Sequence, residues 1–296
     1  MRIAIISDIH GNLEALQAVS SDIERSDADA ILCLGDSIGY GPNPAECLDW
    51  VRAHCFSLLG NAEEAALFAP SAGGEASSPM MAWTRARLGL PDQLPPRQPS
   101  AAQLATAQLA TGQSPRNLVA APDPIRAGGD SGSDADSTPG GTHAGLERRL
   151  FLESLPRVGW RGEALLVHAS PRNPLHEYLL PSCVDAESAF ETLFQLIPRW
   201  AFVGHTHVAG VFTDQRRFLS AAECPRFVLA GHKAIVNVGS VGQPRDGDPR
   251  ACYVLWQRDQ VDFRRVEYDM AGFLAKSRLH PELASSQTAS WFPAAT

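Results

Sequence analysis

The chain has 296 residues, of which 44% are hydrophobic and 20% charged, and its formal net charge is −8. This is the balance of a soluble protein that can bury a large core, in one big domain or two small ones. The acidic balance argues against an electrostatic binder of DNA or RNA. No apolar run reaches the ~20 residues that span a bilayer, so we expect no membrane partner. Six cysteines without C-x-x-C spacing indicate a reduced, cytoplasmic location.

The first strand ends in two side chains that suggest a functional site. Residues 3–6 form an unbroken apolar run, typical of a strand buried on both faces. Asp8 and His10 follow, and apolar residues at helical spacing predict a helix within residues 11–25. A carboxylate and an imidazole at the C-terminal end of a central strand lie where open α/β sheets place their chemistry. A helix cap and a surface histidine would explain the same two residues equally well.

The same pattern repeats along the next 50 residues. A second strand is expected at 30–36 and ends in Asp36, and a helix is expected from Pro44 with Asn43 as its cap. A third strand, at 55–61, ends in Asn61. Successive strand–helix units predict right-handed crossovers and a largely parallel sheet.

The middle of the chain has a different composition. Residues 91–145 are dominated by Ala, Pro, Gly, Ser, Gln and Thr. This composition offers too little apolar surface to offset the entropy of ordering, so we predict a disordered insertion within a single domain of residues 1–280. Helical patterns at 80–88 and 146–155 flank the insertion, and residues 281–296 are expected to form a loose tail.

The second half predicts strands that end in histidines. A strand at 163–171 carries His168 near its end, and a helix at 185–196 leads into the segment 200–207, which ends in His205 and His207. Shorter segments of strand character follow. The last two predict a β-hairpin across a turn near residues 258–260.

Seven potential metal ligands therefore follow five apolar runs: Asp8, His10, Asp36, Asn61, His168, His205 and His207. Because parallel strands bring their C-terminal ends to a common edge, these side chains can converge. Mixed Asp, His and Asn ligands suit Mn, Fe, Zn, Co or Ni rather than calcium. Seven ligands are too many for one tetrahedral ion and suit two divalent ions that share a bridging carboxylate.

The order of these residues resembles a known family. The motifs D-I-H, G-D-S-I-G-Y-G, G-N, V-H-A-S-P-R and G-H-T-H follow one another as in the calcineurin-like metallophosphoesterase superfamily. Residues 237–250, N-V-G-S-V-G-Q-P-R-D-G-D-P-R, are similar to its prokaryotic branch of small phosphodiesterases and diadenosine-tetraphosphatase-like phosphatases. The resemblance covers roughly residues 1–90 and 146–268. It implies an α/β fold, a four-layer α/β/β/α sandwich with two mixed β-sheets.

The resemblance also implies a role for each ligand. One ion would be held by Asp8, His10, Asp36 and His207, and the other by Asp36, Asn61, His168 and His205, with Asp36 bridging. Asp36, Asn61 and His168 would be catalytic, because a metal-bridging hydroxide would attack the phosphorus of a phosphodiester or nucleotide-type phosphate. Ser170 and Arg172 are candidate substrate-binding residues at the mouth of the site. A surface ion pair would explain Arg172 as well.

One position departs from the family pattern. The third motif is usually G-N-H-D or G-N-H-E, whereas here Ala62 and Glu63 follow Gly60 and Asn61. The missing histidine would sit near the leaving group, and losing an acid–base group typically changes the rate by roughly 10²–10⁴. Ala62 therefore favours diesters and good leaving groups over strong monoesterase activity. The alternative function is a metal-binding, catalytically weak scaffold or regulatory module of the same fold. The expected partner is a small phosphorylated substrate, and the oligomeric state stays open, a homo-oligomer included.

Overall fold

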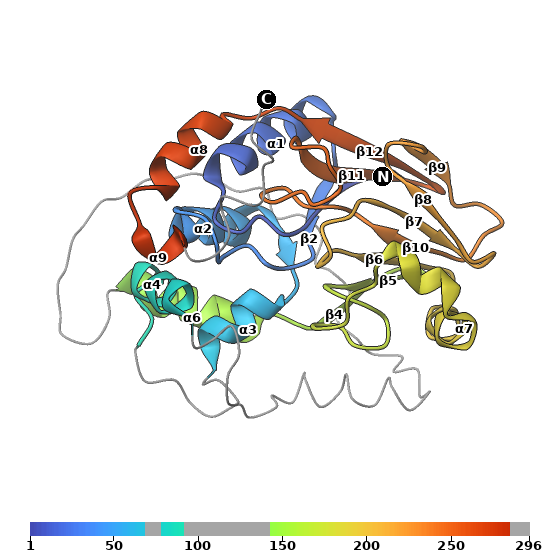
Figure 1. The fold of residues 1–296 in the computed structure, drawn as a ribbon, viewed down its shortest axis with the longest axis horizontal. Coiled ribbons are helices and arrows are strands. Elements are labelled where there is room, and N and C mark those ends of the chain that lie inside the picture. Colours follow the sequence, from blue (N-terminus) through green and yellow to red (C-terminus); the bar gives the residue numbers. More distant parts are fainter. Residues whose placement is uncertain (69–77, 92–142, 285–296) are drawn as a thin grey trace.

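Two mixed β-sheets stack face to face, with helices on their outer faces (Figure 1). The computed structural model describes residues 1–68, 78–91 and 143–284. Within these ranges the layers run α/β/β/α, so the predicted fold class is confirmed. Most of the predicted insertion, residues 92–142, and residues 285–296 of the predicted tail lie outside the described residues.

The first sheet has the strand order β3-β2-β1-β11-β12-β9. Its strands are β1 (Arg2–Ile6), β2 (Ala30–Cys33), β3 (Phe56–Ser57), β9 (Arg226–Val228), β11 (Ala251–Gln257) and β12 (Gln260–Val266). The strands β1, β2 and β3 are parallel, whereas β11, β12 and β9 extend the sheet in antiparallel fashion. The predicted C-terminal hairpin is confirmed, with Gln257 opposite Gln260 at its turn.

The second sheet has the strand order β4-β5-β6-β10-β7-β8. Its strands are β4 (Val158–Arg161), β5 (Ala164–Val167), β6 (Trp200–Val203), β7 (Gly210–Thr213), β8 (Arg217–Ser220) and β10 (Ala234–Asn237). The strands β5, β6 and β10 are parallel, and the other neighbours are antiparallel. The second sheet is therefore mixed, like the first.

The helices form two outer layers and a group at one end of the molecule (Figure 1). Helices α1 (Leu13–Arg25) and α2 (Pro44–His54) cover the first sheet, and α8 (Met270–Ser277) packs against α1. Helix α7 (Glu187–Gln195) covers the second sheet, after a short 3₁₀ helix at Pro181–Asp185. The group at the end consists of α3 (Asn61–Leu67), α4 (Pro79–Leu88), α6 (His143–Ser154) and α9 (Pro281–Ala284). No helix in the described ranges is long and apolar enough to cross a bilayer.

Apolar contacts on both faces of β1 explain why its sequence does not alternate. Ile3 and Ile5 pack between the two sheets, whereas Ala4 and Ile6 pack against the helices of the outer layer. Burying each of the larger side chains contributes about 1.5–3 kcal/mol. The central strand is thereby held from both sides, which gives the residues that follow it a rigid base.

Several local predictions were wrong in detail. Strand β3 ends at Ser57, so Asn61 begins α3 rather than ending a strand. Asn43 precedes α2 as expected, but its side chain donates to the Glu46 carboxylate (3.0 Å) and caps no backbone N–H. Pro44 then starts the helix without a side-chain cap, because its fixed φ already suits the first helical position.

The boundaries of the insertion and the tail also differ from the prediction. Helix α6 begins at His143, inside the range predicted to be disordered, and α9 occupies the first four residues of the predicted tail. Leu283 of α9 is fully buried, which gives that turn a hydrophobic anchor. The edge strands β4 and β8 were not anticipated, because each is only four residues long and β4 contains Gly159.

Candidate metal centre

The predicted ligands converge at the edge where β1, β2, β5 and β6 end. Each comes from a loop directly after one of these strands, except Asn61, which starts α3. The four loops and the start of α3 bring together side chains from both sheets. The aspartates and histidines among them are all buried, with at most 6% of each exposed: Asp8, His10, Asp36, His168, His205 and His207.

The ligand atoms form two clusters, in each of which all atoms lie within 4.8 Å of one another. The first cluster consists of Asp8, His10 and His207, and the second of Asp36, His168 and His205. Asp36 lies between them, since its Oδ2 is 3.7 Å from Nε2 of His10 and 3.4 Å from Nε2 of His168. One carboxylate oxygen therefore reaches both clusters. Asn61 adjoins the second cluster, with its Oδ1 2.9 Å from Nε2 of His168.

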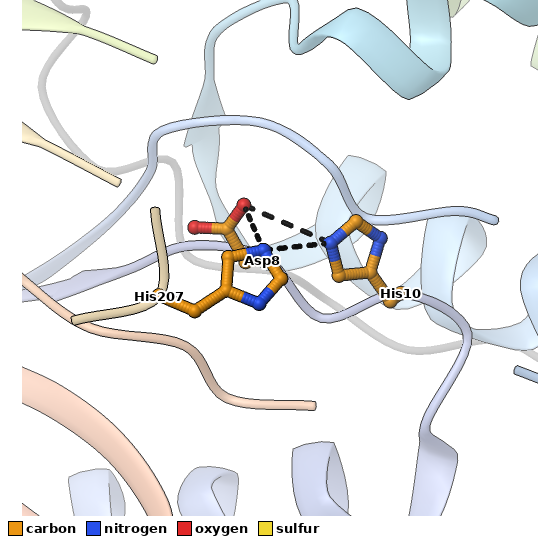
Figure 2. A group of neighbouring side chains, drawn as sticks. All are labelled: Asp8, His10 and His207. Atoms are coloured by element: carbon orange, nitrogen blue, oxygen red, sulfur yellow. Dashed lines mark hydrogen bonds and ion pairs between the residues drawn. The ribbon is translucent and has the colours of Figure 1, made fainter. Parts of the chain in front are cut away.

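In the first cluster, a carboxylate oxygen of Asp8 and one ring nitrogen each of His10 and His207 face one another (Figure 2). Nδ1 of His10 contacts the Ile38 carbonyl oxygen at 3.1 Å, and Nδ1 of His207 contacts that of Gln243 at 2.6 Å. Because a carbonyl oxygen only accepts, each Nδ1 carries the hydrogen and each Nε2 is left with a lone pair. These two Nε2 atoms are 3.2 Å apart, and Oδ1 of Asp8 lies 3.2 Å from that of His207. Three such atoms within 4.8 Å of one another could hold a metal ion.

Each of the two clusters contains a buried atom without a hydrogen-bond partner. Oδ1 of Asp8 and Nε2 of His205 are buried and form no hydrogen bond within the described residues. A buried polar atom left unpaired costs about 1–3 kcal/mol, so native proteins seldom retain one without a reason. One of these atoms belongs to each cluster. Nitrogen and oxygen donors held in this way fit a pair of divalent ions.

The pKa values differ between the clusters. Burial lowers the pKa of His10 to about 3 and that of His205 to about 4, so both rings are neutral at pH 7. Burial would raise the pKa of Asp8, but the neighbouring His207 holds it below its ordinary value. In the second cluster burial opposes protonation of His168, but the Asp36 carboxylate outweighs it and raises the pKa of His168 to about 9. A proton therefore occupies the second cluster until a cation displaces it.

Backbone strain is concentrated at the ligands. Five of them have positive φ angles between 51° and 64°: Asp8, His10, Asp36, His205 and His207. The left-handed region costs a residue other than glycine roughly 1–2 kcal/mol. Backbone hydrogen bonds hold the loops in place, from Asp8 N to the Gly35 oxygen (3.0 Å) and from His10 N to the Asp36 oxygen (2.9 Å). Strain of this kind gathers at functional sites.

Glu63 fastens the loop of Asp36 to the start of α3. Its carboxylate is fully buried and accepts hydrogen bonds from the backbone N–H groups of Asp36 (2.8 Å), Ser37 (2.7 Å) and Gly60 (2.9 Å). The hydroxyl of Ser37 adds a fourth bond. Burial and the nearby Asp36 raise the pKa of Glu63. This role of Glu63 was not predicted from the sequence, although a glutamate three residues after Gly60 is a capping-box signal.

The segment 237–250 fastens the first cluster. The Ser240 hydroxyl and the backbone N–H of Gly242 both donate to the carbonyl oxygen of Asp8, at 2.8 and 3.0 Å. Asn12 caps α1 through its Oδ1 and donates through Nδ2 to the Gly242 oxygen (2.9 Å). Together with the bond from His207 to Gln243, these contacts hold the strained loops. Residues 237–250, which resemble the prokaryotic branch of the family, thus hold ligands of the first cluster in position.

The two predicted substrate-binding residues make contacts of their own beside the centre. The Arg172 guanidinium pairs with Glu177 and also donates to the Ala189 oxygen (3.2 Å). The Ser170 hydroxyl donates to the same Glu177 carboxylate. Arg172 thus forms the surface ion pair that was the alternative interpretation. Tyr178 is 57% exposed and lies beside the second cluster, with its ring centroid 4.2 Å from that of His205.

Position 62 adjoins the first cluster. The backbone N–H of Ala62 donates to Oδ1 of Asp36 (2.9 Å), and its methyl group is buried against Ile38 and Leu59. A Cβ placed on Gly39 would lie 3.6 Å from that methyl group and 3.8 Å from Nδ1 of His10. The side chain at this position is therefore apolar and fully buried, and its backbone contacts the Asp36 carboxylate.

Comparison with known proteins agrees with this geometry. Residues 1–209 match the family of calcineurin-like phosphoesterases, so the chain belongs to that family and the predicted resemblance is confirmed. It is 32% identical over 280 residues to an uncharacterized protein of Methanocaldococcus jannaschii, an alignment that covers 90% of this chain and 88% of that protein.

Two solved structures extend the comparison. The crystal structure of a metallophosphoesterase from Sphaerobacter thermophilus is 29% identical, with 99% of each chain covered and a TM-score of 0.69. The structure of the hypothetical protein PH1004 from Pyrococcus horikoshii is 19% identical, with 96% of each chain covered and a TM-score of 0.57. The second likeness shows the fold alone.

Proposed function

We propose that this protein is a dinuclear-metal-dependent phosphoesterase that hydrolyses phosphodiesters or nucleotide-type phosphates. The main observation behind this proposal is the position of Asp36. One of its carboxylate oxygens lies between two clusters of buried ligand atoms. Family membership supports phosphoester hydrolysis as the reaction class.

The residues of the chain set where the reaction occurs. Two divalent ions, when bound, would stabilise charge on the phosphoryl oxygens and make water a stronger nucleophile. Asp8, His10 and His207 would hold one ion, and His168, His205 and Asn61 the other, with Asp36 serving both. The mixture of nitrogen and oxygen donors favours Mn, Fe, Zn, Co or Ni. Glu63 and Ser240 would keep the two sets of ligands at a fixed separation.

The proposed substrate preference follows from Ala62. A methyl group cannot donate a proton to the leaving group, so esters of poor leaving groups would react slowly. We therefore expect diesters and esters of acidic alcohols to be better substrates than alkyl monoesters. The same methyl group favours the second candidate function, a metal-binding but catalytically weak scaffold or regulatory module.

The remaining features of the proposal concern partners and location. A small phosphorylated substrate is favoured over nucleic acid because the net charge is −8. A cytoplasmic location is supported by the cysteines, all six of which are free. A homo-oligomer is compatible with these features.

A metal-by-substrate screen of the wild type, Asp36→Ala and Ala62→His tests the proposal. We expect about two equivalents of metal in the wild type, hydrolysis of bis(4-nitrophenyl) phosphate, and loss of that hydrolysis in Asp36→Ala. Ala62→His should gain monoesterase activity on 4-nitrophenyl phosphate, by about 10-fold or more. Two bound equivalents without hydrolysis of any ester would favour the scaffold. Less than about one equivalent would contradict the metal centre itself.

A further inference from the structure

Three arginines adjoin segments that carry the ligands, and two of them are paired with carboxylates. Arg157 pairs with Glu64, and Arg172 pairs with Glu177. Arg245 is exposed and forms no ion pair with any residue in the described ranges. Its side-chain hydrogen bond runs from Nη2 to the neutral Oε1 of Gln243, at 3.1 Å. Arg245 therefore keeps its full charge and most of its N–H donors for a ligand from solvent.

The backbone ties Arg245 to a ligand of the first cluster. Its N–H donates to the His207 carbonyl oxygen at 3.2 Å, while the Gln243 carbonyl oxygen accepts from Nδ1 of the same histidine at 2.6 Å. Residues 243 and 245 thus hold His207 from its main chain and from its ring. Gln243 is fully buried, so the amide oxygen that accepts from the guanidinium is packed inside the protein.

The backbone contact with His207 places Arg245 beside the first cluster. The protein groups deepest in the centre include the carboxylates of Asp8 and Asp36, which repel an approaching anion. A fixed cation at the rim offsets that repulsion.

We propose that Arg245 binds a non-bridging oxygen of the substrate's phosphoryl group beside the first cluster, the role that the sequence analysis gave to Arg172. This inference rests on the proposed phosphoesterase function. A guanidinium presents a planar fork of donors that matches two phosphate oxygens. Arg172 would first have to leave Glu177 and the Ala189 oxygen, whereas Arg245 can bind while it keeps its bond to Gln243.

Variants of three arginines test the proposal. Arg245→Ala and Arg245→Lys are compared with Arg250→Ala, a control from the same loop whose guanidinium is paired with Asp248. Arg172→Ala is the competing variant. The probe is inorganic phosphate, titrated calorimetrically into the manganese-loaded protein. The second readout is KM and kcat for bis(4-nitrophenyl) phosphate.

Arg245→Ala should weaken phosphate binding and raise KM by about 10- to 100-fold, the usual effect of losing hydrogen bonds to a charged group. kcat should change less, Arg245→Lys should recover part of the affinity, and Arg250→Ala should stay within about 2-fold of the wild type. Unchanged phosphate affinity in Arg245→Ala would overturn the proposal. So would a loss that appears in Arg172→Ala instead.

Metal content and thermal unfolding of each variant distinguish phosphate binding by Arg245 from an indirect effect on the metal ligands. If Arg245→Ala binds less metal, Arg245 acts through His207 and the proposal is wrong. If the wild type binds phosphate but hydrolyses no ester, the proposed function fails while the titration still decides the role of Arg245. If the wild type does not bind phosphate at millimolar concentrations, Arg245 is not a phosphate-binding residue.

Discussion

Two buried polar networks in this protein satisfy their hydrogen bonds to very different degrees. Under α1, the carboxylate of Asp22 accepts from the Tyr253 hydroxyl at 2.7 Å and from the Arg264 guanidinium at 3.1–3.2 Å. Asp22 is only 8% exposed, and both of its oxygens are paired. In the metal centre, equally buried atoms of Asp8 and His205 have no hydrogen-bond partner within the described residues.

The difference indicates which network contributes to folding and which to function. A fully paired buried carboxylate lowers the free energy of the folded state, whereas unpaired atoms in strained loops raise it. Strained loops with unpaired buried atoms persist where binding of a ligand offsets their unfavourable free energy. We therefore expect changes in the centre to alter metal binding and activity, and changes at Asp22 to alter stability alone.

The largest expected effect is that of Asp36→Asn. The amide has no charge to share between two cations, so hydrolysis should fall about 10³-fold and bound metal should drop below one equivalent. The rise in melting temperature that manganese gives the wild type should disappear with it, because that rise reports binding to the folded state. Metal analysis, scanning calorimetry with and without manganese, and steady-state rates measure these effects. A variant that keeps its manganese-dependent rise would show that Asp36 is not shared by both clusters.

Glu63→Gln tests whether a fully hydrogen-bonded carboxylate can contribute to metal binding as well as to stability. Its carboxylate is fully paired, like that of Asp22, but the groups it holds are the backbones of Asp36, Ser37 and Gly60. Glutamine offers one acceptor oxygen instead of two and turns an NH₂ group toward backbone donors. We expect metal affinity to fall about 10- to 100-fold, as for other groups that orient ligands. Competition with a chelator measures this, and unchanged affinity in a destabilised variant would assign Glu63 to folding alone.

The positions of the ligands could be predicted because each strand end is visible in the sequence. Unbroken apolar runs stop just before Asp8, Asp36 and His168, and parallel strands place such stops at one edge. The positive φ angles at the same residues could not be predicted. Aspartate and histidine adopt that conformation only when hydrogen bonds from other loops enforce it, as the Gly35 oxygen does for Asp8.

The supporting residues were missed for a related reason. Glu63 and Ser240 act on backbone groups that are 26–27 and 232 residues away in sequence, a distance that no local pattern encodes. Arg172 was chosen because it adjoins His168, yet its partner Glu177 lies only five residues further along the same loop. Proximity in sequence therefore indicated which side chains lie together at the strand ends, but it did not reveal the pairing of Arg172 with Glu177.

Asp22→Asn should have the opposite profile to Asp36→Asn. It removes the charge that Arg264 faces and weakens the acceptor of the Tyr253 hydroxyl, so the free energy of unfolding should fall by about 1–2 kcal/mol. Metal stoichiometry and rates should stay within about 2-fold of the wild type. Tyr253→Phe is the matched control, because it removes one hydrogen bond and no charge. Urea unfolding of the metal-free proteins measures the stability, and a loss of bound metal in Asp22→Asn would contradict the separation of the two networks.

The smallest expected effect is the pH dependence of the difference in unfolding free energy between the wild type and Asp22→Asn. Burial alone would raise the pKa of Asp22, but the Tyr253 hydrogen bond and the Arg264 charge outweigh it and hold the pKa below 3.8. A lowered carboxyl pKa stabilises the fold above the pKa of the unfolded chain, and this contribution is lost as pH falls through the folded value. The wild type should therefore exceed Asp22→Asn by a constant amount from pH 7 to about pH 5, and by less below about pH 4. Urea unfolding of both proteins at pH 7, 5 and 3 measures this, and because other groups titrate equally in both, a difference that grows toward pH 3 would mean that Asp22 is not held ionised by its partners.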